Sequence, residues 1–394
     1  MKLRLYRTED HEALARLGKT AFGEGGRPGY WERYFDPEKN PRLDPEQVHV
    51  IEEDGEVRAS ATVLPLEVHL DGETVPLGGV SAVMAHPAYR RRGYAGELMR
   101  AVLGGMCERG VHLSMLWPFS HVFYRSYGWE LAGETISYTL KPTDLPTSPE
   151  QKLLRAYREE DLPRMTALLE TEASEHTLCV RRGEGRWTQC LGRKNVEAAV
   201  YERDGRIEGY LLYEMSEWRE GSVPERTLEV PELVAETLQA REALVSFMAA
   251  QDPLVFEIKH STPRGEPLHP YQRNSYVKAE VSPEFMLRLV DVEGALRLLN
   301  REIGEPLVLE VLDDVIPEKA GEYTVGSGEV VRGAEAEERV SLDVRQLAQL
   351  YAGYLPVRQL ARHGLIETNS PEALERLEAL FPVGDPWISV PDHF

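Results

Sequence analysis

The spacing of apolar and polar residues changes several times along this chain of 394 residues. Around residue 100 the apolar positions recur at helical spacing, which predicts an amphipathic helix over residues 96–108. Its apolar face consists of Leu98, Met99, Val102, Leu103 and Met106. Apolar strands are predicted before and after this helix, over residues 79–87 and 111–117. These segments give the order strand, turn, helix, strand.

Two parts of the chain repeat one pattern. Residues 4–10 resemble residues 155–161, and each segment reads as a short strand that runs into an amphipathic helix. A Glu-Asp pair lies where a helix N-terminus favours negative charge. Residues 50–55 resemble residues 200–205, and each of these strands ends in Asp-Gly, the signal of a two-residue hairpin turn. Both matches occur in the same order at an offset of about 150 residues, which indicates a duplicated domain.

A stretch with three prolines, residues 142–149, marks the boundary between the two copies. A third segment follows Ser282-Pro283 and matches neither copy. It is expected to contain two strands and a helix, over residues 307–312, 321–325 and 344–351. The domains are therefore expected at residues 1–146, 147–283 and 284–394, in line with the length of the chain.

The turn before the helix at 96–108 is rich in arginine and glycine, since residues 90–96 read Arg-Arg-Arg-Gly-Tyr-Ala-Gly. The first backbone N–H groups of a helix have no partner inside the helix and bind anions. Gly93 allows backbone and pyrophosphate to approach closely, and Ala95 and Gly96 keep side chains small. Walker and GxGxxG patterns are absent from this turn. The turn predicts a phosphate site; the alternative is a basic helix N-terminus paired with a neighbouring carboxylate.

The spacing Arg90-x-x-Gly93-x-Ala95 resembles the acetyl-CoA motif [RQ]-x-x-G-x-[GA] of the GNAT N-acetyltransferase superfamily. The resemblance implies acetyl-CoA as co-substrate. It also implies a bulge in the preceding strand, whose backbone at Val83 and Met84 binds the pantetheine arm. The cofactor-binding residues expected from it are Val83, Met84, Arg90, Arg91, Arg92, Gly93, Ala95 and Gly96.

Residues 123–129 read Phe-Tyr-Arg-Ser-Tyr-Gly-Trp and resemble the F-Y-x-x-x-G-F signature of the same superfamily. The tyrosine of that signature lies near the leaving thiolate, which implies that Tyr124 is the acid that protonates the CoA sulfur. The alternative is that Tyr124 only packs against the cofactor. Tyr127 is the weaker candidate for the acid, and His121 is considered as a base or a bridge to one.

The second copy lacks the phosphate-binding turn of the first. Where the phosphate turn should stand, residues 228–238 contain no glycine-rich loop, and the nearby charges are acidic. Such a segment repels an anion, so the second copy is expected to be structural and to form a wall of the substrate cleft.

A GNAT unit, a degenerate second copy and an unrelated third segment together resemble the enhanced intracellular survival (Eis) family of acetyltransferases. This resemblance implies an α/β (α+β) chain with tandem GNAT-fold domains and a sterol-carrier-protein-like C-terminal domain. In that family the C-terminus is buried in the active site of the first domain, and its carboxylate is the base. By position that carboxylate belongs to Phe394, and the alternative is a disordered terminus.

The same resemblance implies a homo-oligomer, a hexamer, that acetylates cationic amines in an acidic, aromatic pocket. Residues in the corresponding stretches are Phe22, Glu24, Trp31 and His121, which are therefore expected on the substrate side. The stretch 117–121, Trp-Pro-Phe-Ser-His, departs from the family pattern of small and acidic residues. This departure concerns the substrate pocket more than the cofactor site.

Composition narrows the alternatives. A net charge of −21 disfavours a nucleic-acid partner and attracts cations. The absence of long apolar runs and of a signal-peptide pattern leads us to expect a cytoplasmic protein without membrane contact. Three cysteines without CxxC spacing disfavour a disulfide framework, and no metal is expected.

The function predicted from the sequence is transfer of an acetyl group from acetyl-CoA to a primary amine. The acceptor is expected to be a cationic small molecule or a lysine-like substrate, and the amine is expected to attack the thioester directly. One alternative is a non-catalytic acetyl-CoA-binding sensor or scaffold protein. A weaker alternative is lipid binding by the third segment.

Overall fold

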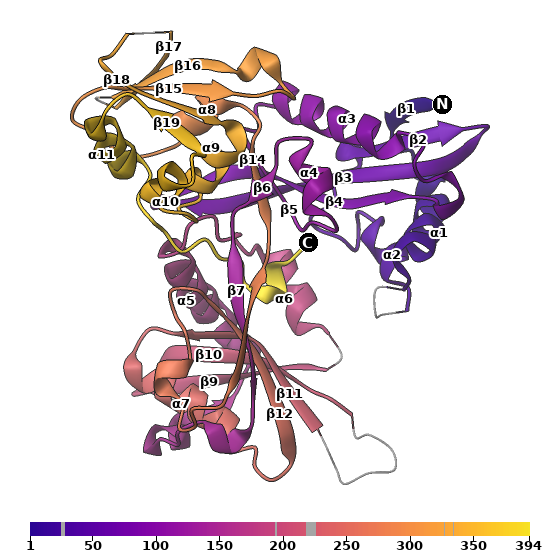
Figure 1. Cartoon of the computed structure of the whole chain (residues 1–394). Helices are drawn as coiled ribbons and strands as arrows, with labels where there is room; N and C mark the ends of the chain where they lie inside the picture. Colours follow the sequence, from indigo (N-terminus) through magenta and orange to yellow (C-terminus); the bar gives the residue numbers. More distant parts are fainter. Residues whose placement is uncertain (25–27, 194, 218–225, 327, 334) are drawn as a thin grey trace. The chain divides into compact units, whose positions relative to one another are not determined.

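The protein is described by a computed structural model that covers residues 1–24, 28–193, 195–217, 226–326, 328–333 and 335–394 (Figure 1). Three β-sheets organise the chain, and it divides into two compact units. The first unit contains residues 1–132, 284–384 and 394, and the second contains residues 133–283 and 385–393. No helix in the described part of the chain is long and apolar enough to cross a membrane.

The first sheet has seven strands in the order β1-β2-β3-β4-β5-β14-β6. Their bounds are Lys2–Leu5, Val48–Glu53, Glu56–Leu70, Glu73–Ala85, Leu113–Leu116, Met286–Leu289 and Glu130–Leu131. The α-helices of the same region are α1 (His11–Phe22), α2 (Tyr30–Tyr34), α3 (Tyr94–Glu108) and α4 (His121–Arg125).

Helix α3 is the amphipathic helix that the sequence predicts. All five residues of its expected apolar face are buried, and they pack on Val63 and Val80 of the sheet. The helix starts at Tyr94 rather than at residue 96, because Gly93 has φ +85° and serves as its N-cap. That conformation costs glycine little, since it has no Cβ.

Strands β4 and β5 form a fork. They pair in parallel only from Gly78 to Val80, and beyond Val80 strand β4 pairs with β3 alone. The register of β3 and β4 shifts after Ser81, and Ala82 has φ +48°, so β4 carries a bulge at this point. The bulge expected from the family resemblance is therefore present.

The second sheet has seven strands in the order β13-β7-β12-β11-β10-β9-β8. Their bounds are Lys278–Pro283, Glu134–Leu140, Val255–Pro263, Arg226–Ala235, Arg206–Met215, Val196–Arg203 and Leu154–Ala156. The accompanying α-helices are α5 (Leu162–Ser174), α6 (Glu184–Leu191) and α7 (Leu238–Ala249).

The two copies share structural details as well as sequence. The same ion network ties the first strand to the following turn and to the next strand: Arg4 with Asp10 and Glu52, and Arg155 with Asp161 and Glu202. Both predicted hairpins have positive φ at both Asp and Gly, at 54–55 and 204–205. The repeated pattern in the sequence therefore encodes a repeated local structure.

The copies exchange one strand each. Strand β7 follows β6 in the sequence but lies in the second sheet, between β12 and β13. Strand β14 follows β13 but lies in the first sheet, between β5 and β6 (Figure 1). Each sheet is thus completed by a strand that its own copy does not supply. The sequence ranges 1–146, 147–283 and 284–394 stay predictions, because these units are assembled from separate segments.

The third sheet has the order β17-β16-β15-β18-β19. Its strands span Glu329–Arg332, Gly321–Gly326, Leu307–Leu312, Glu338–Asp343 and Ile366–Thr368. The α-helices of this region are α8 (Val292–Arg297), α9 (Val344–Tyr351), α10 (Val357–Arg362) and α11 (Pro371–Leu380). The predicted strands and helix at 307–312, 321–325 and 344–351 correspond to β15, β16 and α9.

Candidate active site

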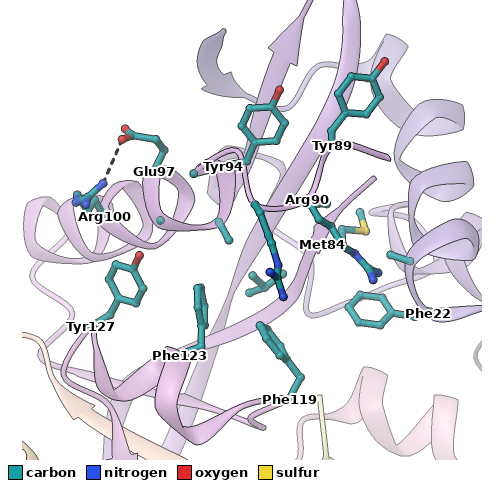
Figure 2. A pocket seen from close by; sticks show the side chains of 17 residues that line it. Phe22, Met84, Tyr89, Arg90, Tyr94, Glu97, Arg100, Phe119, Phe123 and Tyr127 are labelled. Carbon is teal, nitrogen blue, oxygen red and sulfur yellow. Dashed lines mark hydrogen bonds and ion pairs between the residues drawn. The ribbon is translucent and has the colours of Figure 1, made fainter. Parts of the chain in front are cut away.

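A cavity of about 930 Å³ opens beside the N-terminus of α3 in the first unit (Figure 2). Its volume falls within the range of small-molecule sites. The end of β4, the arginine turn, the first turn of α3 and the aromatic residues around α4 line it. From the arginine turn and α3 come Arg90, Arg91, Gly93, Tyr94, Ala95, Gly96, Glu97 and Arg100.

The N-terminus of α3 is open to an anion. Gly93 offers no side chain to cap the helix, and a Cβ placed on it would meet nothing within 4 Å. Arg91 has φ +63° and Gly93 has φ +85°, so two residues of this turn adopt left-handed backbone just before the helix. Arg90 and Arg91 both line the cavity. The arrangement fits a phosphate group held by backbone N–H groups and arginine charge.

The Arg92 side chain lies away from the cavity that Arg90 and Arg91 line. Its guanidinium lies 4.7 Å from the centre of the Tyr89 ring and 3.6 Å from Glu53 on β2. The Tyr94 hydroxyl donates to the same carboxylate at 2.6 Å, and this bond is the main reason that the pKa of Glu53 lies below its usual value. Arg92 thus braces the turn and is not among the described residues that line the cavity.

The bulge brings the end of β4 to the cavity. Val83, Met84 and Ala85 all line it, directly after the bulge residue Ala82. Beyond Val80 no described strand pairs with this edge of β4, because β5 has diverged. Val83 and Met84, the two residues expected from the family resemblance to bind the pantetheine arm, therefore line the cavity.

Gly96 leaves room for the Tyr127 hydroxyl beside the first turn of α3. A Cβ at Gly96 would lie 2.6 Å from the Tyr127 hydroxyl, which is too close for a real contact. Tyr127 lines the cavity together with Phe119 and Phe123, and Figure 2 shows these three rings on one side of it.

Tyr124 lies behind the aromatic wall formed by Phe119, Phe123 and Tyr127. It is 2% exposed, and its ring lies 5.1 Å from those of Phe119 and Phe123. Burial raises the pKa of its phenol. It is not among the described residues that line the cavity.

Phe394 lies at the fork of β4 and β5. Its ring packs edge-on against Trp117, with centroids 4.7 Å apart, and Trp117 directly follows β5. A Cβ at Gly79 would be 2.8 Å from the Phe394 ring, so only glycine leaves room for it there. Gly78 faces Met106 of α3 instead. Because neighbouring residues on a strand face opposite sides, Phe394 lies on the sheet face away from α3.

Three family models match the chain. An acetyltransferase (GNAT) domain matches residues 2–132, another matches residues 178–289, and a sterol carrier protein domain matches residues 292–389. Two of the three matched domains are thus of the acetyltransferase (GNAT) type. The architecture of the chain is tandem GNAT domains followed by a sterol carrier protein domain, as the sequence predicts. The second GNAT match also confirms the duplication inferred from the repeat.

Relatives and solved structures agree with this architecture. An uncharacterized N-acetyltransferase of Streptomyces avermitilis is 26% identical over 82% of each chain. One of Streptomyces griseus is 25% identical over 82% of this chain and 83% of the relative. A GCN5-related N-acetyltransferase from Anabaena variabilis has a TM-score of 0.86 at 22% identity, with all of both chains covered. Eis1 from Mycobacterium abscessus has a TM-score of 0.79 at 24% identity, again over both whole chains. These two structures share the fold of this GNAT protein.

The four residues expected on the substrate side of the GNAT site have different surroundings. Phe22 lines the cavity and stacks on Trp31, with ring centroids 5.6 Å apart. Trp31 itself is buried, and its indole N–H donates to the Gly23 carbonyl at 2.7 Å. Glu24 is exposed and lies 3.3 Å from Lys19. His121 is half-buried at the start of α4, and of the four only Phe22 is among the described residues that line the cavity.

The sequence reasoning missed Gly79, Phe119 and Phe123 as parts of the GNAT site. One signal was present for Gly79, since paired glycines inside a strand indicate a close approach of another group. Phe119 and Phe123 lie next to the predicted Tyr124. Their facing into the cavity follows from the conformation of the 117–121 stretch and α4, which no local pattern specifies.

Proposed function

We propose that this GNAT protein transfers an acetyl group to a primary amine of a cationic small molecule or of a lysine-like substrate. Acetyl-CoA, when bound, supplies the acetyl group as a reactive thioester. In this proposal the amine attacks the thioester directly, without a covalent intermediate on the chain. The observation that carries the proposal is the position of Phe394 at the fork of the first GNAT sheet.

The residues around the cavity fit coenzyme A. The uncapped N-terminus of α3, with Arg90 and Arg91 beside it, suits the pyrophosphate. The edge of β4 at Val83 and Met84 suits the amide groups of the pantetheine arm, because amides pair readily with strand backbone. The rings of Phe119, Phe123 and Tyr127 give the cavity an aromatic wall.

Phe394 is the proposed base. A terminal α-carboxylate is ionised at neutral pH and accepts a proton from an incoming ammonium group. The packing of the Phe394 ring between Trp117 and the Gly79 backbone holds this residue at the fork. It lies on the sheet face opposite α3, so an amine on that face meets a carboxylate.

Tyr124 is the proposed acid for the departing thiolate. Because burial raises the pKa of Tyr124, the phenol stays protonated through neutral and moderately alkaline pH and keeps its proton to give. Tyr127, which lines the cavity, is the second candidate.

Charge favours a cationic acceptor. The chain has a net charge of −21, and a negative field raises the local concentration of cations. Glu24 lies two residues from the cavity residue Phe22, and Lys19 partly neutralises it. Phe22 itself offers a ring face to a cation.

The test is turnover of acetyl-CoA with spermine, kanamycin and Nα-acetyl-lysine as acceptors. Wild-type protein should acetylate at least one of these amines. Tyr124→Phe should lower kcat about 100-fold, the usual contribution of a general acid. Deletion of Phe394 should lower kcat to a similar extent and leave the affinity for acetyl-CoA, measured by calorimetry, within about threefold, because the cofactor cavity does not include Phe394.

Tyr127→Phe is the matched control and should keep kcat within a few-fold of wild type. A large loss of kcat in Tyr127→Phe, with little loss in Tyr124→Phe, would assign the role of acid to Tyr127. Full activity in both Tyr124→Phe and the Phe394 deletion would reject both proposed roles. Tight binding of acetyl-CoA without turnover of any of these amines would favour the sensor or scaffold alternative.

A further inference from the structure

The second GNAT domain has a strand fork like that of the first, but it lacks the open helix N-terminus that suits a cofactor phosphate. Strand β11 pairs in parallel with β12 only from Arg226 to Val230, and its remaining half pairs with β10 alone. Val230 corresponds in the repeat to Val80, where the first fork opens. Helix α7 is capped by the hydroxyl of Thr237, which accepts from the Ala240 N–H at 3.2 Å. The N-terminus of α7 therefore has a side-chain cap, whereas that of α3 has none.

A buried ion network occupies this second fork. Glu232 lies two residues beyond Val230, and its carboxylate meets both terminal nitrogens of Arg182, at 2.9 and 2.5 Å. The Tyr210 hydroxyl donates to the same carboxylate at 2.8 Å. Arg182 also binds Asp392, with Nε and Nη2 at 2.9 and 2.7 Å from one carboxylate oxygen. All three charged side chains are 0–1% exposed.

Two residues that this network binds, Ser389 and Asp392, belong to the C-terminal segment of the chain. Ser389 hydrogen-bonds to Glu232, and Asp392 pairs with Arg182. The Arg186 guanidinium donates to the carbonyl of Pro391 and, at 3.2 Å, to that of His393. Residues 389–393 are thus held by side chains of the second GNAT domain up to the residue before the C-terminus.

The chemistry of this network favours precise placement over stability. Burying charges costs much of what their pairing returns, and an apolar contact of the same volume is often at least as stable. A guanidinium shared by two carboxylates, however, fixes direction as well as distance. Phe394 follows Asp392 by two residues, so its Cα can lie no more than about 7.6 Å from that of Asp392.

We propose that the fork of the second GNAT domain is a built-in binding site for the C-terminal segment 389–393. Arg182, Glu232 and Asp392 are its positioning residues, and they act by placing the Phe394 carboxylate. This inference rests on the proposed role of that carboxylate as the base. It gives the degenerate copy a function: its fork holds a peptide of the same chain in place of a cofactor.

The first experiment measures release of Phe394 by carboxypeptidase A from the full-length protein under native conditions. Arg182→Met leaves the sequence of the tail unchanged and should speed release at least tenfold over wild type. Arg182→Lys keeps the charge but cannot bind two carboxylates in the same way, and it replaces Arg182→Met if that variant does not fold. Release at the wild-type rate from a folded Arg182 variant would overturn the inference.

Arg155→Met is the matched control, because Arg155 also bridges two carboxylates of the same domain but does not touch the tail. It should release Phe394 at the wild-type rate. Equal acceleration in Arg155→Met and Arg182→Met would mean that general loosening of the domain, and not the loss of a tail site, exposes Phe394. That result too would overturn the inference.

The second experiment is a double-mutant cycle on kcat with the acceptor found active above. If Arg182 acts only through Phe394, then Arg182→Lys should lower kcat in the full-length chain and have no further effect once Phe394 is deleted. KM for acetyl-CoA should stay unchanged throughout. Equal losses in both backgrounds would overturn the positioning role. If deletion of Phe394 leaves kcat unchanged, the proposed base fails, while carboxypeptidase release still reports separately on the tail site.

Discussion

At the scale of single residues, a buried histidine contacts residues 385–387, which lie just before the C-terminal segment 389–393. His176 lies between two carboxylates, 3.6 Å from Glu172 and 3.4 Å from Asp385, and its ring is 5.0 Å from that of Trp387. Burial alone lowers the pKa of His176, but the two carboxylates outweigh burial and raise it to about 9. The histidine is therefore cationic at neutral pH and ties residues 385–387 to α5.

This histidine should make stability depend on pH. Its pKa is about 9 in the folded protein and about 6.5 when unfolded, so its contribution is complete below pH 6.5 and lost as pH rises through 9. We expect the free energy of unfolding to fall by up to about 3 kcal/mol over that interval, measured by urea denaturation. His176→Gln should flatten this part of the profile.

His363→Gln serves as the control, because His363 is exposed and should leave the profile as in wild type. A wild-type slope that persists in His176→Gln would show that other groups cause it.

At the scale of elements, strand β4 carries most of the site. Its paired glycines face opposite sides of the sheet: Gly78 faces Met106 of α3, and Gly79 faces Leu66 and Phe394. Its bulge at Ala82 then turns the following backbone to the cavity. The two faces of this strand thus meet α3 and Phe394 separately, and a methyl group added on either face tests the two contacts separately.

Gly79→Ala should displace the Phe394 ring, because the new Cβ would lie 2.8 Å from it. We expect kcat to fall about 10–100-fold, as misplacement of a catalytic group by an ångström does, with KM for acetyl-CoA nearly unchanged. Gly78→Ala is the matched control, since its Cβ would meet the side chains of Met106 and Val63 and not Phe394. It should lower the melting temperature but keep kcat within about threefold, since overpacking costs about 1–3 kcal/mol. Equal kcat in the two variants would contradict a role for Phe394 at the fork.

At the scale of the whole molecule, net charge and strand exchange matter most. The charge of −21 acts on any approaching amine before it reaches a particular residue. The exchange of β7 and β14 means that neither GNAT sheet is complete without a segment from beyond its own copy. The second GNAT family match runs to residue 289 and so includes β14, although β14 pairs in the first sheet.

The charge predicts a salt dependence. KM for spermine, a polycation, should rise several-fold between about 0.05 and 0.5 M NaCl, because salt screens the field that attracts it. KM for benzylamine, which carries a single charge, should rise much less, and KM for acetyl-CoA should not rise in parallel with that for spermine. Initial rates at several salt concentrations test this. An equal response of both amines would argue against steering by the net charge.

The sequence by itself determined the features that depend on local pattern. The apolar face of α3, the arginine turn with Gly93 and the two Asp-Gly hairpins all follow from residues close together in the chain, so their spacing reveals them. The duplication was visible for the same reason. Tyr124 was predicted to be the acid from a local signature, and that role stays a prediction; its burial behind Phe119 and Phe123 could not be seen in the signature.

Only the tertiary structure decided which distant segments meet. Strand β14 has four residues, all buried, and so has no alternating pattern to show which sheet it joins. The turn of Arg92 toward Glu53, the fit of Phe394 against Gly79 and the pairing of Arg182 with Asp392 join residues far apart in sequence. Such contacts depend on how whole elements pack and on where a buried charge finds its partner. Local spacing carries neither kind of information, and this is why the buried contacts between the second GNAT domain and residues 389–393 emerged only from the folded chain.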